Sequence, residues 1–272
     1  MTAASEIATT HQHSAASGQA IAEHFLAQGW GIIPGVLTGD QCAELRGEMD
    51  RIFRDVPITH PEQGYGSEHH RVKMFQFSPL IASYIDYTPV IDVMDRILGN
   101  TCHLIYNNAV FSNRQHAIDT WHTDDELWLP LPPGATLPDD IPAPCFCINT
   151  QWYLTDVGEE DGPTQVVPFS QRSGTVPQLG ADGIPRWRGH EPRSLIVKAG
   201  DVGLQNWMTW HRGAPVQSER TRYLLQFGYG RRLIAQRFYP FVNYHHAPAW
   251  LLEQATPRRR RVLGFHERGP GG

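Results

Sequence analysis

The spacing of apolar and polar positions divides the chain into a helical N-terminal part and a longer part made of short strands. Apolar residues at helical spacing predict helices from about Ser17 to Gly29, over Gln41–Phe53 and over Pro89–Leu98. Gly31–Leu37, between the first two, reads as a short apolar strand closed by turn residues.

From residue 101 onward the pattern is typical of strands separated by Gly, Pro and Asp turns. The predicted strands are His103–Ser112, Phe146–Thr155, Gln165–Pro168, Ser194–Val197, Gly203–Met208 and Tyr223–Tyr229. Segments 57–72, 130–144 and 174–193 are predicted to be long loops. Because helices precede strands without βα alternation, we expect an α+β fold, a sandwich or jelly roll with the early helices packed on one sheet.

Composition narrows the class of protein. The 272 residues are 40% hydrophobic and 19% charged, with a net charge of −5, so global disorder is excluded and no basic surplus favours nucleic-acid binding. No apolar run reaches the length of a membrane span. Residues 1–17 read as a disordered tail without a secretory leader, and 18–272 as a single domain. The four cysteines are too sparse for a disulfide scaffold, which favours buried free thiols in a cytoplasmic protein.

A possible metal site is indicated by one histidine–carboxylate pair and a distant histidine. His122 and Asp124 lie two residues apart, so in extended backbone their side chains point to the same side. His-x-Asp alone is weak evidence, but His211 follows a Gly-Asp turn and a strand that could return to the same place. Two imidazoles and one carboxylate are the facial ligands of non-heme iron(II) oxygenases. A zinc hydrolase could use the same three residues.

An arginine further along supplies a second candidate binding group. In the strand Arg222–Tyr229, Arg222, Leu224 and Gln226 share one face, while the other face is apolar and is predicted to pack under the helices. Arg222 would then face the interior of the barrel, where a buried guanidinium needs an anionic partner. A carboxylate-bearing cosubstrate would provide one. A cupin-like ligand-binding protein or isomerase, the alternative from another class, has no need of this arginine.

Taken in order, these motifs resemble the phytanoyl-CoA dioxygenase family of iron(II)/2-oxoglutarate oxygenases. Segments 28–37 and 161–174 are similar to that family's first strand and its Asn-Gly…Pro-Gly-Ser-His stretch, and the likeness runs from about residue 22 to 265. Phe169-Ser170-Gln171 replaces the usual Gly-Ser-His, the Asn common after the distal histidine is missing, and 130–144 is insertion-like. These departures leave the metal triad intact and the substrate open.

The resemblance implies a double-stranded β-helix, or jelly roll, and the cofactor set of iron(II), 2-oxoglutarate and O2. His122, Asp124 and His211 would bind the iron, and Arg222 the far carboxylate of 2-oxoglutarate. A family residue near Gln151 helps to hold 2-oxoglutarate, and Asn108 on the preceding strand is similarly placed; these amides could equally satisfy backbone groups at strand edges.

The expected activity is hydroxylation of an unactivated C–H bond in a small or medium organic molecule, with release of succinate and CO2. A natural-product or secondary-metabolite pathway is favoured over acyl-CoA hydroxylation. Desaturation, cyclisation or epimerisation by the same iron-centred oxidation stays an alternative. Halogenation is not expected, because related halogenases replace the metal-binding carboxylate that Asp124 supplies here. Oligomeric state is not indicated.

The loops 57–78, 112–120, 130–144 and 174–193 are expected to line or cover the pocket. They carry a mixture of basic and aromatic side chains that suits an anionic group but is also typical of solvated loops: His69, His70, Arg71, Lys73, Arg114, Arg186, Trp187 and Arg188. The run Arg258–Arg261 is predicted to be a solvated face of the last helix.

Overall fold

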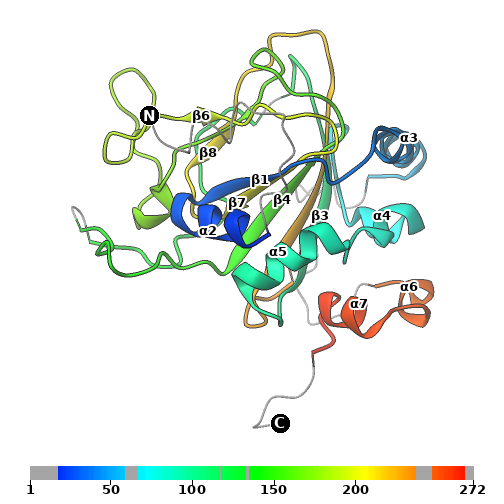
Figure 1. The fold of residues 1–272 in the computed structure, drawn as a ribbon. Helices are drawn as coiled ribbons and strands as arrows, with labels where there is room; N and C mark the ends of the chain where they lie inside the picture. The colour runs from blue at the N-terminus through cyan, green and yellow to red at the C-terminus, as the bar shows by residue number, and fades with distance from the viewer. Residues whose placement is uncertain (1–17, 59–66, 117, 133–134, 237–246, 267–272) are drawn as a thin grey trace.

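Two antiparallel sheets form the framework of the protein, shown by a computed structural model (Figure 1) that describes residues 18–58, 67–116, 118–132, 135–236 and 247–266. The larger sheet has six strands in the order β1 (Trp30–Ile33), β7 (Val202–Asn206), β4 (Cys147–Tyr153), β9 (Arg222–Gly230), β3 (His103–Ser112) and β2 (His70–Val72). The smaller sheet has the order β6 (Arg193–Ser194), β5 (Thr164–Val166) and β8 (His211–Gly213). Neighbouring strands pair antiparallel throughout both sheets.

Helices cover one face of the larger sheet (Figure 1). They are α2 (Gly18–Gln28), α3 (Gly39–Asp55), α4 (Pro79–Ser83), α5 (Thr88–Leu98), α6 (Ala249–Glu253) and α7 (Pro257–Val262), with short 3-10 turns at η2 (Met74–Gln76) and η3 (Ser170–Arg172). A capping box at Thr38 starts α3, because its hydroxyl accepts from the Gln41 N–H while the Gln41 side chain accepts from the Thr38 N–H. In the described part of the chain, no helix is both long and apolar enough to cross a bilayer.

Alternation along the central strands separates the helix-covered core from a cavity. On β9, Leu225, Phe227 and Tyr229 pack into the main core with the helices, whereas Arg222 and Gln226 line the cavity on the opposite face. The strand β4 divides in the same way, with Ile148, Trp152 and Leu154 in the core and Asn149 and Gln151 at the cavity. The face assignment predicted for β9 from the period of two is therefore correct.

The structure corrects three predictions about local structure. Residues 70–72, predicted to lie in a loop, form β2, which pairs with the edge of β3. The predicted strand Ser194–Val197 is reduced to the two-residue β6, and the run beginning at Gly31 ends as a strand at Ile33. In each of these three segments, pairing with a neighbouring strand determines which residues form the strand. The sequence of one segment does not show which neighbour it will pair with.

The arginine run is also not a solvated face. Arg258 pairs with Asp92, Arg259 with Asp86 at 2.5 Å, and Arg261 with Asp95 at 2.7 Å. Asp92 and Asp95 belong to α5, so these ion pairs fasten α7 to it. The predicted tail 1–17 lies outside the described residues, and the single domain over 18–272 stays a prediction.

Candidate metal and cosubstrate site

The structure brings His122, Asp124 and His211 together at one end of the cavity. One ligand atom from each lies within 4.8 Å of those of the other two, and the His211 Nε2 atom lies 3.5 Å from Asp124 Oδ1. The imidazole rings are 4.1 Å apart between centroids. Two imidazole nitrogens and one carboxylate oxygen in this arrangement form a donor set that suits iron(II).

Backbone hydrogen bonds hold the three residues in place. His122 and His211 form an antiparallel bridge, in which each N–H donates to the other carbonyl at 2.9 and 3.0 Å. The Asp124 N–H donates to the Trp207 carbonyl at 3.0 Å. These bonds attach the segment around the His-x-Asp motif to the start of β8, where His211 lies. Strand pairing thus brings together metal-ligand candidates that are far apart in the sequence.

The histidine tautomers are set by carbonyl groups. Nδ1 of His122 contacts the Thr120 carbonyl at 2.6 Å, and Nδ1 of His211 contacts the Thr209 carbonyl at 2.9 Å. A carbonyl can only accept, so each Nδ1 carries the proton and each Nε2 presents its lone pair. Burial, followed by the neighbouring His211, lowers the pKa of His122, which favours the neutral form that binds a metal.

Behind Asp124, a chain of buried side chains makes hydrogen bonds that the sequence did not indicate. The Gln205 amide donates to Asp124 Oδ2 at 3.4 Å, and the Gln151 amide donates to Gln205 Oε1 at 3.2 Å. Gln151 Oε1 in turn accepts from the hydroxyls of Tyr153 at 2.6 Å and Thr164 at 2.9 Å. Both ends of the Gln151 amide are therefore engaged with protein groups, and its predicted contact with 2-oxoglutarate stays a prediction. We refer to Gln205 and Gln151 as the glutamine relay.

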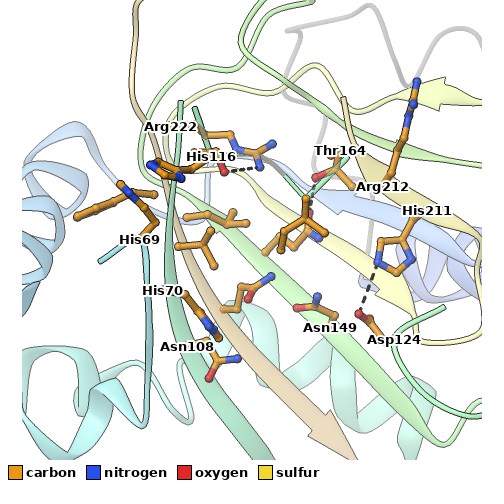
Figure 2. A pocket seen from close by; sticks show the side chains of 18 of the residues that line it. His69, His70, Asn108, His116, Asp124, Asn149, Thr164, His211, Arg212 and Arg222 are labelled. Carbon is orange, nitrogen blue, oxygen red and sulfur yellow. Dashed lines mark hydrogen bonds and ion pairs between the residues drawn. The ribbon is translucent and has the colours of Figure 1, made fainter. Parts of the chain in front are cut away.

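Arg222 occupies a different side of the same cavity (Figure 2). It is 7% exposed; it donates to the Gly162 carbonyl through Nη1 and to Ser112 Oγ at 3.0 Å through Nη2, while its buried Nε–H has no partner. Among the described residues no carboxylate lies within ion-pair distance of it. Burial lowers the pKa of Arg222 from its usual value, as expected for a cation without a counter-charge. Arg220, by contrast, pairs with Asp161 and is largely exposed.

The cavity between these groups has a volume of about 610 Å3, within the roughly 300–1,000 Å3 of small-molecule sites. Asn108, Asn149 and Gln151 all line it, and the amide oxygen of the buried Asn149 has no hydrogen-bond partner. Gln226 also lines the cavity, on the face of β9 that the alternation predicted. Ser112 and Thr164 line it too, but the sequence did not single them out, because a serine and a threonine in strands are too ordinary to stand out.

Of the four loops that were expected to line or cover the pocket, two contribute described residues to its lining. Described residues of 57–78 and 112–120 contribute to the wall, among them His69, His70 and Lys73. Loops 130–144 and 174–193 instead contact each other, with Arg188 Nη1 2.6 Å from Asp139 Oδ1, and none of their described residues lines this cavity.

Comparison with known proteins decides the family. The family model described as phytanoyl-CoA dioxygenase (PhyH) matches residues 25–224, more than half of the chain. The chain belongs to the phytanoyl-CoA dioxygenase family. This family uses iron(II), 2-oxoglutarate and O2, in agreement with the resemblance stated for its motifs.

The curated relatives are more distant. The chain is 26% identical over 173 residues to an L-proline trans-4-hydroxylase of Streptomyces griseoviridis, covering 61% of each protein. It is 24% identical over 170 residues to an ectoine dioxygenase of Nocardia farcinica, covering 60% of this chain and 54% of that protein. The matched regions thus span about half to three fifths of these relatives.

Solved structures show the same fold at low identity. HygX from Streptomyces hygroscopicus, solved with nickel and 2-oxoglutarate bound, aligns with a TM-score of 0.61 at 19% identity over 78% of this chain and 86% of its own. The epimerase SnoN, in complex with Fe3+, alpha ketoglutarate and nogalamycin RO, aligns with a TM-score of 0.62 at 17% identity over 86% and 88%.

Proposed function

We propose that this protein is an iron(II)/2-oxoglutarate-dependent dioxygenase that hydroxylates a C–H bond of a small or medium organic molecule in a natural-product or secondary-metabolite pathway. The two sheets would then be the two halves of a jelly roll, with the cavity at its mouth. The observation that carries the proposal is Arg222: a buried guanidinium that has no carboxylate partner among the described residues shares one cavity with a two-histidine, one-carboxylate donor set.

The groups of the cavity fit both the metal and the cosubstrate. His122, His211 and Asp124 would hold the iron, with each histidine held as the Nδ1–H tautomer by a carbonyl. Arg222 would bind the far carboxylate of 2-oxoglutarate, and its unpartnered Nε–H and the unpartnered Asn149 oxygen are polar atoms that a bound ligand could satisfy. When bound, iron and 2-oxoglutarate together activate O2 for oxidation of the C–H bond.

The protein residues have three tasks in this scheme. The triad would hold the metal through three protein ligands at one end of the cavity, where the cosubstrate and substrate could reach it. Arg222 orients the cosubstrate by its carboxylate, and the glutamine relay holds the second oxygen of Asp124, so that Oδ1 is the atom turned towards His211. Trp207, Val72 and Leu224 supply apolar wall that limits access of water.

The test uses purified protein with iron(II), 2-oxoglutarate and 18O2. We expect succinate that contains one 18O atom, even without the natural substrate, because slow uncoupled turnover consumes the same cosubstrates. Succinate formation that is absent, or that takes no oxygen from O2, would overturn the proposal. Once a substrate is found, a product that gains one 18O indicates hydroxylation, and a loss of two hydrogens without label indicates desaturation or cyclisation.

A further inference from the structure

On its cavity face, the larger sheet arranges its side chains in rows that cross the strands. Three rows follow one another on the paired strands β3 and β9: Ser112 with Arg222, Val110 with Leu224, and Asn108 with Gln226. All of these residues line the cavity. The first row holds the proposed cosubstrate arginine, the second is apolar, and the third consists of two amide side chains. The chemistry of the wall therefore changes in steps away from Arg222.

A histidine of β2 lies beside the two amides of the third row. His70 pairs with Val110, two residues from Asn108, so His70 and Asn108 are diagonal neighbours on one face of the sheet. Figure 2 shows these two side chains close together, across the cavity from the proposed metal site. We call His70, Asn108 and Gln226 the polar trio.

The side-chain hydrogen-bonding atoms of the polar trio have no partner among the described residues. Asn107, the neighbour of Asn108 on β3, shows the contrast: its buried amide accepts from the Phe75 N–H at 2.8 Å and donates to the Gln226 carbonyl at 2.9 Å. The three side chains of the polar trio are only half-buried, so a molecule in the cavity can reach their polar atoms. Their unused donors and acceptors are what a ligand would satisfy.

The polar trio is uncharged. Burial, followed by the neighbouring Arg71, lowers the pKa of His70, so its imidazole is neutral near pH 7. A neutral imidazole and an amide each offer both a donor and an acceptor. A carboxylate only accepts and an ammonium only donates, so either group would leave part of the polar trio without a partner. A ligand amide, with an N–H beside a C=O, can satisfy both kinds of atom.

The polar trio is also separated from the place proposed for the cosubstrate. Gln226 lies four residues beyond Arg222 on β9, which is about 13 Å at roughly 3.3 Å per residue. The apolar row of Val110 and Leu224 lies between them. With both cofactors bound, the charges of iron(II) and Arg222 balance those of Asp124 and 2-oxoglutarate. A cosubstrate that spans from Arg222 to the triad therefore leaves the polar trio to a second molecule.

The other two cations that line the cavity have partners within the protein. Arg212 donates from Nε to Gln165 at 2.9 Å, and its guanidinium lies 4.9 Å from the centroid of the Trp121 ring. Lys73, beside the polar trio, also has an interaction of its own. A charged substrate would thus lose its hydration without gaining an unengaged counter-charge from the described wall, which is costly.

We propose that the substrate is an uncharged molecule with an amide group, whose N–H and C=O pair with Asn108 and Gln226 while His70 is a third partner. The adjoining hydrocarbon part of the substrate would lie on the apolar row of Val110 and Leu224. Asn108 then serves the substrate and not 2-oxoglutarate. This proposal rests on the proposed function and specifies its substrate class.

The test is isothermal titration calorimetry of the protein loaded with iron(II) and saturating 2-oxoglutarate, without O2. The probes are two series of similar shape that differ in charge: benzamide, benzoate and benzylamine, and cyclohexanecarboxamide, cyclohexanecarboxylate and cyclohexylmethylamine. We expect at least one amide to bind with a dissociation constant of roughly millimolar, and roughly tenfold or more tightly than the carboxylate and the amine of its series. If no amide binds, or if a carboxylate or an amine binds as tightly as its amide, the proposal is overturned.

Variants of Gln226 locate the bound amide. Gln226→Leu should weaken binding of the amide roughly tenfold, because its hydrogen bonds to the side chain are lost. Gln226→Glu keeps the shape of the side chain but adds a negative charge, and it should shift the preference from the amide to the amine. Gln178→Leu, at an exposed site outside the cavity, is the control and should bind the probes as the wild type does. An unchanged preference in both Gln226 variants would contradict the proposal.

The variant Asn108→Leu distinguishes the substrate from the cosubstrate. It should weaken binding of the amide and leave the affinity for 2-oxoglutarate at the wild-type value. If it weakens 2-oxoglutarate and leaves amide binding unchanged, Asn108 holds the cosubstrate and the proposal is wrong. If the wild-type protein itself fails to bind iron and 2-oxoglutarate, the proposed function is what fails.

Discussion

The two ends of the cavity are built by different means. At the proposed metal end, His122, Asp124 and His211 are positioned by backbone hydrogen bonds, and the Nδ1 atoms of the two histidines donate to carbonyl groups. At the other end, Arg222 projects from the first position of the long strand β9 and is held by Gly162 and Ser112. The metal end has its ligands arranged in advance, whereas the Arg222 end holds a buried charge that still needs an anion. Changes at one end should therefore be separable from changes at the other.

The largest effect is expected at the metal end. Asp124→Ala should abolish stoichiometric iron binding and turnover, because two histidines alone are a poor iron(II) site. Metal content after anaerobic reconstitution and gel filtration measures it. Asp125→Ala, which removes the neighbouring carboxylate outside the triad, is the matched control and should retain iron. Full iron occupancy in alanine variants of all three predicted ligands would show that the site is wrong.

The next effect is expected at the Arg222 end. Loss of one partner from a buried charge pair costs about 3–5 kcal/mol, so Arg222→Met should raise the KM for 2-oxoglutarate by between roughly 10²-fold and several thousandfold, with iron affinity little changed. Arg220→Met is the control, since this exposed arginine pairs with Asp161. If the KM for 2-oxoglutarate is unchanged in Arg222→Met and rises in Arg220→Met, the cosubstrate binds to Arg220 and the assignment to Arg222 is wrong.

A substitution in the glutamine relay should have a smaller effect, and this effect should be confined to iron binding. Gln205→Leu removes the hydrogen bond to Asp124 Oδ2, and loss of such a partner to a ligand typically costs 10- to 100-fold in metal affinity. The KM for 2-oxoglutarate at saturating iron should change much less. Isothermal titration with iron(II) gives the affinity, and Gln178→Leu, at an exposed site, is the control. If Gln205→Leu binds iron as the wild type does, the relay does not position Asp124.

The smallest effect is expected from Ser112→Ala. Arg222 keeps its bond to Gly162 and its charge but loses one neutral partner, at 3.0 Å. An ordinary hydrogen bond contributes about 1 kcal/mol, so the KM for 2-oxoglutarate should rise by roughly fivefold. An effect as large as that of Arg222→Met would mean that Ser112 itself is a principal contact of the cosubstrate.

Sequence reasoning succeeded where a single periodicity decides the answer. The alternation in β9 predicted which side chains face the cavity, and the order His-x-Asp, distant His, Arg predicted which residues come together. Prediction from the sequence failed where the structure of a segment depends on contact with residues far along the chain. β2 exists because β3 offers it an edge, and Gln205 reaches Asp124 across 81 positions of the chain. The ion pairs of Arg258–Arg261 likewise depend on aspartates in and near α5.

We propose that His122, Asp124 and His211 hold iron at one end of the cavity and that Arg222, at the other end, binds the far carboxylate of 2-oxoglutarate. The most direct test is an anaerobic titration of the iron(II)-loaded protein with 2-oxoglutarate, followed by the visible absorption of the metal–cosubstrate complex. We expect saturable absorption for the wild type, the same absorption at a much higher 2-oxoglutarate concentration for Arg222→Met, and none for Asp124→Ala. A wild-type protein that binds iron but develops no such absorption, or an Arg222→Met variant that saturates at the wild-type concentration, would contradict it.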